Sequence, residues 1–168
     1  MQWGELGDQA CSLSRTVSVI GDRWTLLILR DCFLKVRRFD DFQSRLGIGR
    51  PILADRLNKL VEEFVLTKVA YQNNPQRYEY RLTAKGLDLY PVIMSIVHWG
   101  DVHMARKKGP PIVHHHLKCG HNLDPVMVCS ECQVPLDPRE VRPMPGPGAR
   151  HPRHMPLDSV DIFRRAKK

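Results

Sequence analysis

Four residues near the C-terminal end have the types and the spacing of a metal site. His116 and Cys119 are separated by two residues, as are Cys129 and Cys132, and nine residues lie between the two pairs. Thiolate sulfur and imidazole nitrogen bind Zn²⁺ tetrahedrally in structural sites, and this spacing lets one tight turn present both ligands of a pair. We therefore expect these four side chains to hold a structural Zn²⁺ in a zinc-ribbon-like module over residues 113–140, which is too short to build a core alone.

The histidine of this ligand set is open to alternatives. His121 could replace His116, and His114 and His115 are weaker candidates. The alternative without a metal is a group of free thiols, or a redox pair formed by Cys129 and Cys132.

The motifs of common enzymes are absent from this sequence. A zinc-dependent nucleobase deaminase needs His-x-Glu and Pro-Cys-x-x-Cys, but Val128 precedes Cys129 and no Glu follows His116 or His121 by two residues. There is also no His-Glu-x-x-His, no Gly-x-Ser-x-Gly and no glycine loop of the phosphate-binding type. A protein that is not an enzyme is expected, and a zinc-dependent enzyme is the weakest alternative.

Cys11 is open to a different chemistry. It stands at the start of a helix predicted over residues 11–20, where a thiol pKa is lowered and the thiolate is more available. Cys11 is therefore a candidate reactive thiol, and the alternative is a small buried side chain. Cys32 ends an apolar helix and is expected in the core. Five cysteines, three of them clustered, favour metal or redox chemistry over a disulfide framework.

A helix, a glycine-containing turn and a second helix are predicted over residues 37–60. Residues 39–46 and the segment that begins near Pro51 both place apolar side chains at helical spacing, and residues 46–49 form the turn between them. This order is that of a DNA-binding helix-turn-helix, whose second helix enters a major groove.

The flanking segments predict a winged version of that motif. A buried helix over residues 24–30 has Asp22 as its N-cap. Strands are predicted over residues 65–71 and 77–83, joined by a polar loop at 72–76, and Thr83 is expected to cap a long final helix that kinks at Pro91 and ends near residue 104. The expected fold is therefore mainly α with a small β-hairpin wing, plus a short C-terminal zinc-knuckle-like module.

The charge distribution agrees with this division of the chain. Residues 35–85 and 141–168 each carry a net charge of +5, whereas residues 1–34 and 86–140 each carry −1. The basic charge of the folded part thus lies in the helix-turn-helix region, where a DNA surface needs it. We expect a DNA-binding domain at 1–106, a linker at 107–112, the Cys/His-rich module at 113–140 and a disordered basic tail at 141–168. No apolar run is long enough for a membrane span and the N-terminus has no signal-peptide pattern, so a cytoplasmic protein is expected.

Several separated motifs resemble the HxlR-type helix-turn-helix transcriptional regulators. In chain order they are Cys11, residues 20–30, Arg38-Phe39, Asp55-Arg56-Leu57 and residues 80–86, and the resemblance covers about residues 10–105. It implies a winged-helix homodimer with terminal helices at the dimer interface, which binds a palindromic operator in double-stranded DNA. It also implies that Cys11, which stands where many members carry a sensing cysteine, is a candidate redox or electrophile sensor. One departure is Gly49, which stands where many members begin the recognition helix with a hydroxyl-bearing residue, so one phosphate contact is lost.

The predicted DNA contacts fall in three places. On the recognition helix, arginine and asparagine side chains opposite the buried leucines can pair with guanine and adenine. The residues before the first helix of the motif and those at the wing tip are expected to position the phosphate backbone or to contact the minor groove. The alternative is an ordinary solvated surface, and Arg56 is expected to pair with Asp22 or Glu63. The predicted set is Arg37, Arg38, Arg50, Asp55, Asn58, Lys59, Asn73, Asn74, Gln76 and Arg77.

The function expected from these observations is sequence-specific regulation of transcription, with repression favoured. The expected signal is an oxidant, an electrophile or a small molecule. The alternative is a constitutive or architectural DNA-binding protein whose basic tail adds nonspecific affinity.

Overall fold

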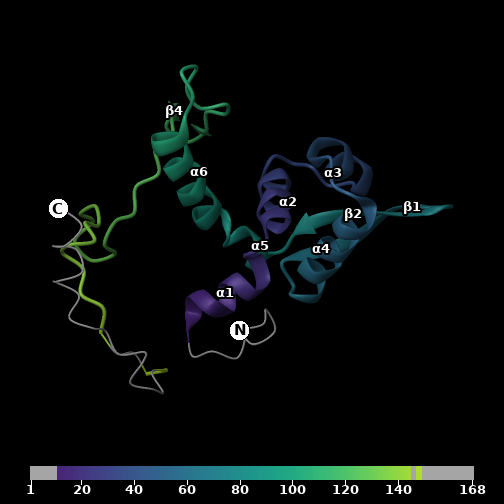
Figure 1. Cartoon of the computed structure of the whole chain (residues 1–168), viewed down its shortest axis with the longest axis horizontal. Helices are drawn as coiled ribbons and strands as arrows, with labels where there is room; N and C mark the ends of the chain where they lie inside the picture. The colour runs from purple at the N-terminus through teal and green to yellow at the C-terminus, as the bar shows by residue number, and fades with distance from the viewer. Residues whose placement is uncertain (1–10, 145–146, 149–168) are drawn as a thin grey trace.

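The computed structural model describes residues 11–144 and 147–148, and Figure 1 shows the order of their elements. Six helices and two antiparallel hairpins are found in these residues. They are α1 (Ser12–Ile20), α2 (Arg23–Phe33), α3 (Phe39–Leu46), α4 (Arg50–Glu62), β1 (Leu66–Asn73), β2 (Gln76–Leu82), α5 (Ala84–Leu87), α6 (Tyr90–Met104), β3 (His115–His116) and β4 (His121–Asn122). No helix of this part of the chain is long and apolar enough to cross a membrane. The predicted tail, residues 141–168, lies outside the described residues except for 141–144 and 147–148.

The predicted helix boundaries around the helix-turn-helix are confirmed. The Asp22 carboxylate accepts hydrogen bonds from the backbone N–H groups of Trp24 and Thr25, which have no helical acceptor in the first turn of α2. Helix α3 ends at Gly47, whose φ of 62° lies in the left-handed region that glycine adopts without strain. Pro51 lies in the first turn of α4, where its missing N–H costs no helical hydrogen bond.

The prediction of one long helix from Thr83 to residue 104 is wrong. Thr83 does cap a helix, since its hydroxyl accepts from the N–H of Gly86 at 3.1 Å, but that helix is the short α5. Pro91 cannot follow helical residues without its ring meeting the carbonyl of Leu87. The chain therefore leaves the helix after Leu87 and restarts at Tyr90, with Pro91 in the first turn of α6.

The wing strands reach further into the turn than the sequence predicts, and β1 is one residue longer than the predicted strand. Strands β1 and β2 pair from Leu66–Leu82 out to Asn73–Gln76, so only two residues remain in the turn instead of the predicted loop at 72–76. The segment before α3 joins this sheet, because the N–H of Tyr80 donates to the carbonyl of Arg37 at 2.8 Å. In Figure 1 the wing projects from the helices on the side opposite to α6.

One core holds the helix-turn-helix and the base of the wing. Ile28 and Leu29 of α2 meet Phe42 of α3 and the leucines of α4, and all of these side chains are buried. Gly86 lets α5 approach this core, because a Cβ at this position would collide with the backbone oxygen of Val65. Helix α4, the predicted recognition helix, is thus held along its whole buried side, which fixes the direction of its exposed side.

A buried carboxylate connects α2 with α3. Asp31 has no solvent exposure, and its oxygens accept from Arg30 at 2.8 and 2.9 Å and from Arg45 at 3.1 Å. The guanidinium groups reach solvent on their outer sides, which lowers the cost of burying the acid between them.

Asp22 connects α2 with the recognition helix, and we expect its removal to destabilise the fold. Partial burial raises the pKa of Asp22, but hydrogen bonds from Arg56 and from the N–H of Thr25 outweigh this, so its pKa lies below the ordinary 3.8. A lowered pKa in the folded state means that the charged carboxylate stabilises the fold above about pH 4 and that this contribution is lost as the pH falls further.

Urea unfolding of Asp22→Ala should therefore show a loss of about 1–2 kcal/mol at pH 7 and a smaller loss at pH 3. Asp22→Asn retains a capping oxygen but not the charge, and should lose less than alanine at pH 7. Equal losses for Asp22→Ala at both pH values would contradict the role of the charge.

Candidate nucleic-acid interface

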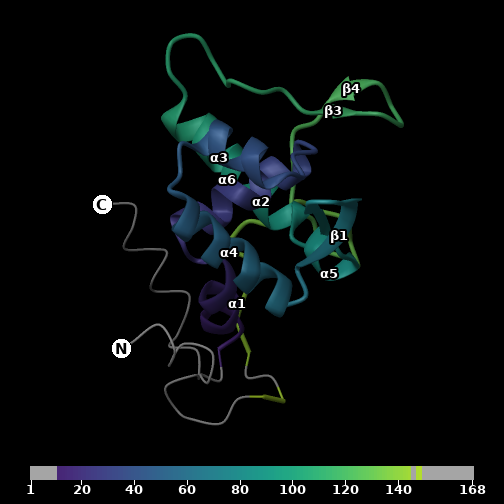
Figure 2. The same cartoon turned by 90° about the vertical axis from the view of Figure 1, so that its right-hand side faces the viewer.

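The exposed side of α4 is the side predicted from the leucine spacing. Leu53, Leu57 and Leu60 are fully buried, while Pro51, Asp55, Asn58 and Glu62 lie on the exposed arc. Figure 2 shows α4 crossing the molecule between α1 and α3, with the wing at its side. Helix-turn-helix proteins present the N-terminal residues of such a helix to base edges.

Arg50 lies at the start of this exposed side and is held by α3. Its guanidinium donates to Gln43 at 2.9 Å and to Asp40 at 3.2 Å, and its carbon Cζ lies 4.8 Å from the centre of the Phe39 ring. The side chain nevertheless remains 64% exposed. The arginine is therefore pre-positioned at the junction of α3 and α4, with its outer edge open to a ligand.

Two further predicted contacts on α4 have partners within the protein. The carboxylate of Asp55 pairs with Arg56, which also reaches Asp22 with an Nε–Oδ1 distance of 3.0 Å. Of the two acids expected to pair with Arg56, Asp22 is thus the one that does. Asn58 accepts a hydrogen bond from Nζ of Lys68 at 2.9 Å, which connects the recognition helix with β1.

Lys59 lies on a different side of α4 from the other predicted contacts. Its Nζ donates to the carbonyl of Ser18 at 2.6 Å, in the last turn of α1. A cation at this place is favourable because the C-terminal carbonyls of a helix carry partial negative charge. The structure therefore places the ammonium of Lys59 against α1, whereas the sequence places it near DNA.

Arg37 and Arg38 lie at the base of the wing. The Arg38 guanidinium lies 4.5 Å from the centre of the Tyr71 ring and 3.7 Å from the carboxylate of Glu79. A hydrogen bond from Arg81 is the main reason why the pKa of Glu79 is lowered, and the neighbouring charges of Arg37 and Arg38 lower it further. This cluster fastens residues 37–38 to β2, and Arg37 remains exposed beside it.

The four residues predicted at the wing tip are all exposed. Gln72 donates to the carbonyl of Asn74 at 3.0 Å, which orders the turn, and Arg77 stands beside it. No ion pair in the described part of the chain involves Arg77, so its charge is available to a phosphate. The exposed set at the tip is Asn73, Asn74, Gln76 and Arg77.

Two exposed features were missed by the analysis of the sequence. Ile52, on the first turn of α4, is 45% exposed. On α6, the side opposite the core exposes Val92, Ile96 and Trp99 by 40%, 50% and 58%. Their spacing of four and three residues places them on one stripe, a signal that the sequence already contained.

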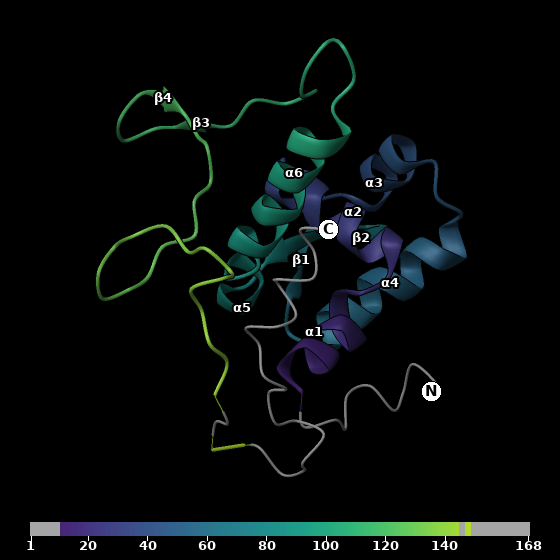
Figure 3. The same cartoon turned by 60° about the vertical axis from the view of Figure 1, so that its left-hand side comes forward.

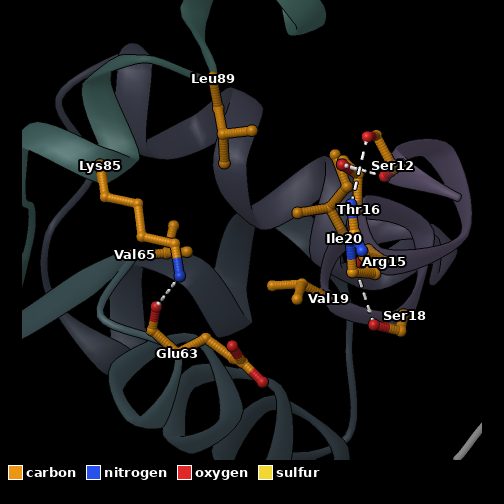
Figure 4. A pocket seen from close by; sticks show the side chains of 10 residues that line it. All are labelled: Ser12, Arg15, Thr16, Ser18, Val19, Ile20, Glu63, Val65, Lys85 and Leu89. Atoms are coloured by element: carbon orange, nitrogen blue, oxygen red, sulfur yellow. Dashed lines mark hydrogen bonds between the residues drawn. The ribbon is translucent and has the colours of Figure 1, made fainter. Parts of the chain in front are cut away.

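A pocket of about 550 Å³ opens between α1, the end of α4 and α5. Figure 4 shows Val19 and Val65 toward its interior and Lys85 at its margin. Nζ of Lys85 donates to the carbonyl of Glu63 at 2.6 Å, which joins α5 to the end of the recognition helix. The pocket thus lies against the elements that hold α4 in place.

The two N-terminal cysteines differ in exposure and in the direction of their pKa shifts. Hydrogen bonds from the backbone N–H and the side chain of Ser14 lower the pKa of Cys11, which is partly exposed at the start of α1. Burial is the main reason why the pKa of Cys32 rises to about 12. Cys32 is therefore a buried thiol of the core, as its apolar context predicts, whereas Cys11 is partly exposed.

The four predicted zinc ligands form two separate pairs. The Nδ1 atom of His116 lies 3.1 Å from Sγ of Cys119. Backbone N–H groups of Cys132 and Glu131, followed by the Cys132 thiol, lower the pKa of Cys129 by hydrogen bonding. Within residues 11–144 and 147–148, no three His, Cys, Asp or Glu side chains come together closely enough to hold a metal ion.

Known proteins resemble this chain in sequence and in structure. A family model described as HxlR-like helix-turn-helix matches residues 19–108. An uncharacterized HTH-type transcriptional regulator of Mycobacterium tuberculosis is 45% identical over 137 residues, which is 82% of this chain and 87% of the relative. The matched region of 137 residues cannot fit within residues 1–108, so it extends beyond the family model into the C-terminal segment.

Two solved structures match a similar share of the chain. PA1607, described as a candidate transcription factor, superposes with a TM-score of 0.74 and 33% identity over 82% of this chain and 96% of its own. PA1374 of Pseudomonas aeruginosa, described in the same way, gives a TM-score of 0.57 and 34% identity over 83% and 95%. Transcriptional regulators of this kind are not enzymes. From its helix-turn-helix, its wing and these matches, the chain belongs to the HxlR-like helix-turn-helix family of transcriptional regulators.

Proposed function

We propose that this protein is a transcriptional repressor that binds a palindromic operator as a homodimer. The observation that carries the proposal is the exposed side of α4, which has Arg50 at its start and the wing beside it. A major groove admits one helix, and arginine is the side chain that most often reads guanine there. A dimer bound over an operator excludes other proteins from the same DNA, which is the simplest route to repression.

The DNA contacts divide into reading and positioning residues. We assign base reading to Arg50 and to Asn58, and Asn58 can leave Lys68 to pair with adenine. The exposed wing tip, with Arg77, is placed for phosphate or minor-groove contacts. Arg38 and Lys59 support the interface through contacts within the protein: Arg38 packs on the wing and Lys59 binds α1.

The outer stripe of α6 supports the dimer. Val92, Ile96 and Trp99 are exposed on a helix whose other side is already buried through Ile93 and Met94. A second copy of this chain offers the same stripe, and a two-fold arrangement covers both at once. In Figure 3, α6 forms the edge of the helical domain on the side toward β3 and β4. The two recognition helices of such a dimer read half-sites about one helical turn apart.

Cys11 supports a response to oxidants or electrophiles. Its lowered thiol pKa favours the thiolate, which is the nucleophilic form. Helix α1, which Cys11 precedes, is tied to the recognition helix through Lys59 and the carbonyl of Ser18. A modification that shifts α1 therefore acts on α4, and a small molecule in the pocket between them has the same route.

Mild oxidation is accordingly expected to lower operator affinity by about tenfold, a coupling of the usual size for a ligand-controlled regulator. The measurement is DNA titration before and after treatment with a quinone, with modification of Cys11 followed by mass spectrometry. Cys11→Ser should retain affinity and lose the response. Full modification of Cys11 with unchanged operator affinity would end the sensor proposal.

A second candidate function is constitutive, largely nonspecific DNA binding. It is favoured by the net charge of +5 in residues 141–168, which equals that of residues 35–85. Salt separates the two candidates, because binding through phosphates alone falls steeply with ionic strength and shows little sequence preference.

The proposed function is tested by competition. Full-length protein is titrated onto the DNA upstream of its own coding sequence, with a shuffled duplex of equal length and composition as competitor at matched salt. An operator-binding regulator should prefer the upstream DNA by about a thousandfold. Equal affinity for both duplexes at every salt concentration would support the nonspecific alternative.

A further inference from the structure

Two segments of the Cys/His-rich module share one backbone geometry. We call residues 114–123 the first hairpin and residues 127–136 the second hairpin. The N–H of Leu123 donates to the carbonyl of His114 at 2.6 Å, and the N–H of Leu136 donates to that of Met127 at 2.9 Å. The donor and the acceptor of the second bond each lie thirteen residues after those of the first.

The same offset relates the tight turns within the hairpins. Gly120 donates its N–H to the carbonyl of His116, and Gln133 donates to that of Cys129, both at 2.9 Å. Gly120 and Gln133 also share a left-handed backbone, with φ of 73° and 59°. That conformation is uncommon for a residue other than glycine. Its presence at Gln133 therefore gives the second turn the same backbone shape as the first.

Both hairpins place a pair of metal-binding side chains at the same two positions of this turn. His116 and Cys119 occupy them in the first hairpin, and Cys129 and Cys132 in the second. His121 is opposite His116 across the β3–β4 pairing and corresponds in the second hairpin to a valine, Val134, which cannot bind a metal. The repeat therefore selects His116 among the alternative histidines.

The side chains within each pair already approach one another. The 3.1 Å between Nδ1 of His116 and Sγ of Cys119 is close to the roughly 3.5 Å that separates two ligands of a tetrahedral Zn²⁺. In the second hairpin, Cys129 and Cys132 lie in the same tight turn, which the bond from the N–H of Gln133 to the carbonyl of Cys129 closes.

The module has no core of its own to bring these hairpins together. No side chain of residues 105–144 is buried, and several apolar side chains of the hairpins are exposed. They include Leu117, Val126, Met127, Val128 and Val134. A metal ion held by both pairs is the usual means by which so short a segment acquires a fixed fold.

We propose that the two hairpins together bind one structural Zn²⁺ through His116, Cys119, Cys129 and Cys132. The ion draws the second pair against the first and closes a tetrahedral site with four protein ligands, which leaves no open position for catalysis. The segment between the hairpins contacts the main domain, because Asp124 lies 3.1 Å from Nδ1 of His98 on α6. The metal-bound module is thus anchored on the helix that carries the outer stripe.

The proposal is tested by metal analysis of the full-length protein, purified under reducing conditions and without chelator, then equilibrated with excess Zn²⁺ and desalted. One equivalent of zinc is expected, and Co²⁺ in its place should give the visible absorption of tetrahedral thiolate coordination. Cys129→Ser and His116→Ala should each weaken zinc retention against a competing chelator by about a hundredfold. His121→Ala is the matched control and should retain one equivalent.

Three results would overturn the proposal. They are less than half an equivalent of zinc in the wild type, equal retention by Cys129→Ser, or a loss of about two mass units from a disulfide between Cys129 and Cys132 under the same reducing conditions. Circular dichroism of each variant checks that the main domain, whose core lies outside the module, is still folded. None of these readouts uses DNA, so the zinc site and the proposed function fail or succeed separately.

Discussion

Arg50→Ala is expected to weaken operator binding by about ten- to a hundredfold for each half-site and to leave binding to unrelated DNA nearly unchanged. A bidentate arginine–guanine contact contributes about 1–3 kcal/mol of discrimination, and a dimer makes it twice. The guanidinium is pre-positioned by Gln43, Asp40 and Phe39, so little side-chain entropy is lost on binding. The measurement is titration of operator and shuffled duplexes at matched salt.

Two further variants distinguish base reading by Arg50 from the effect of its positive charge. Arg50→Lys retains the charge but not the planar fork, and should lose most of the operator preference. Arg77→Ala removes an exposed charge at the wing tip and should weaken both duplexes alike, with a lower salt dependence. Equal losses on both duplexes for Arg50→Ala would refute its role as a base-reading residue.

Ile96→Asp is expected to convert the dimer into monomers and to reduce operator affinity by about a thousandfold. Ile96 lies in the middle of the outer stripe of α6 at 50% exposure, so a two-fold dimer brings both aspartates into its apolar centre. Each monomer then binds one half-site, and the gain from joint binding of two sites is lost. Light scattering gives the mass in solution, and DNA titration gives the affinity.

Ile96→Leu is the matched control for this substitution. It changes the same side chain in the middle of the outer stripe but keeps it apolar. The dimer and its operator affinity should survive it. A monomeric wild type, or an Ile96→Asp variant of unchanged mass, would contradict the proposed interface.

Local signals made most of the fold predictable. The caps at Asp22 and Thr83, Gly47 at the end of α3 and Pro51 at the start of α4 each act within a few residues, so the sequence alone reveals them. The effect of Pro91 was underestimated, because the sequence pattern continues through it while the backbone cannot. An apolar period alone does not distinguish a kinked helix from two helices.

The partners of the basic residues were less predictable, because they depend on tertiary structure. Arg45 pairs with Asp31 and Lys59 binds the carbonyl of Ser18, forty-one residues away in sequence. A run of cations in the sequence therefore overstates the charge available to DNA. Among the residues predicted to contact DNA, Arg37, Arg50 and Arg77 keep exposed side chains, at the wing base, at the start of α4 and at the wing tip.

The C-terminal module illustrates the opposite case. The ligand spacing was readable from the sequence, but the correspondence between the two hairpins needed the backbone, because only the hydrogen bonds and the left-handed residues relate Gly120 to Gln133. That correspondence also distinguishes His116 from His121, which spacing left open.

A nuclease footprint on the DNA upstream of the protein's own coding sequence tests the central claim most directly. Wild-type protein should protect two half-sites whose centres lie about 34 Å apart, or a multiple of this spacing, related by a palindrome. Arg50→Ala should lose the protection at concentrations where Arg77→Ala only weakens it. Uniform protection without half-sites, or the same footprint for wild type and Arg50→Ala, would contradict sequence-specific binding through α4.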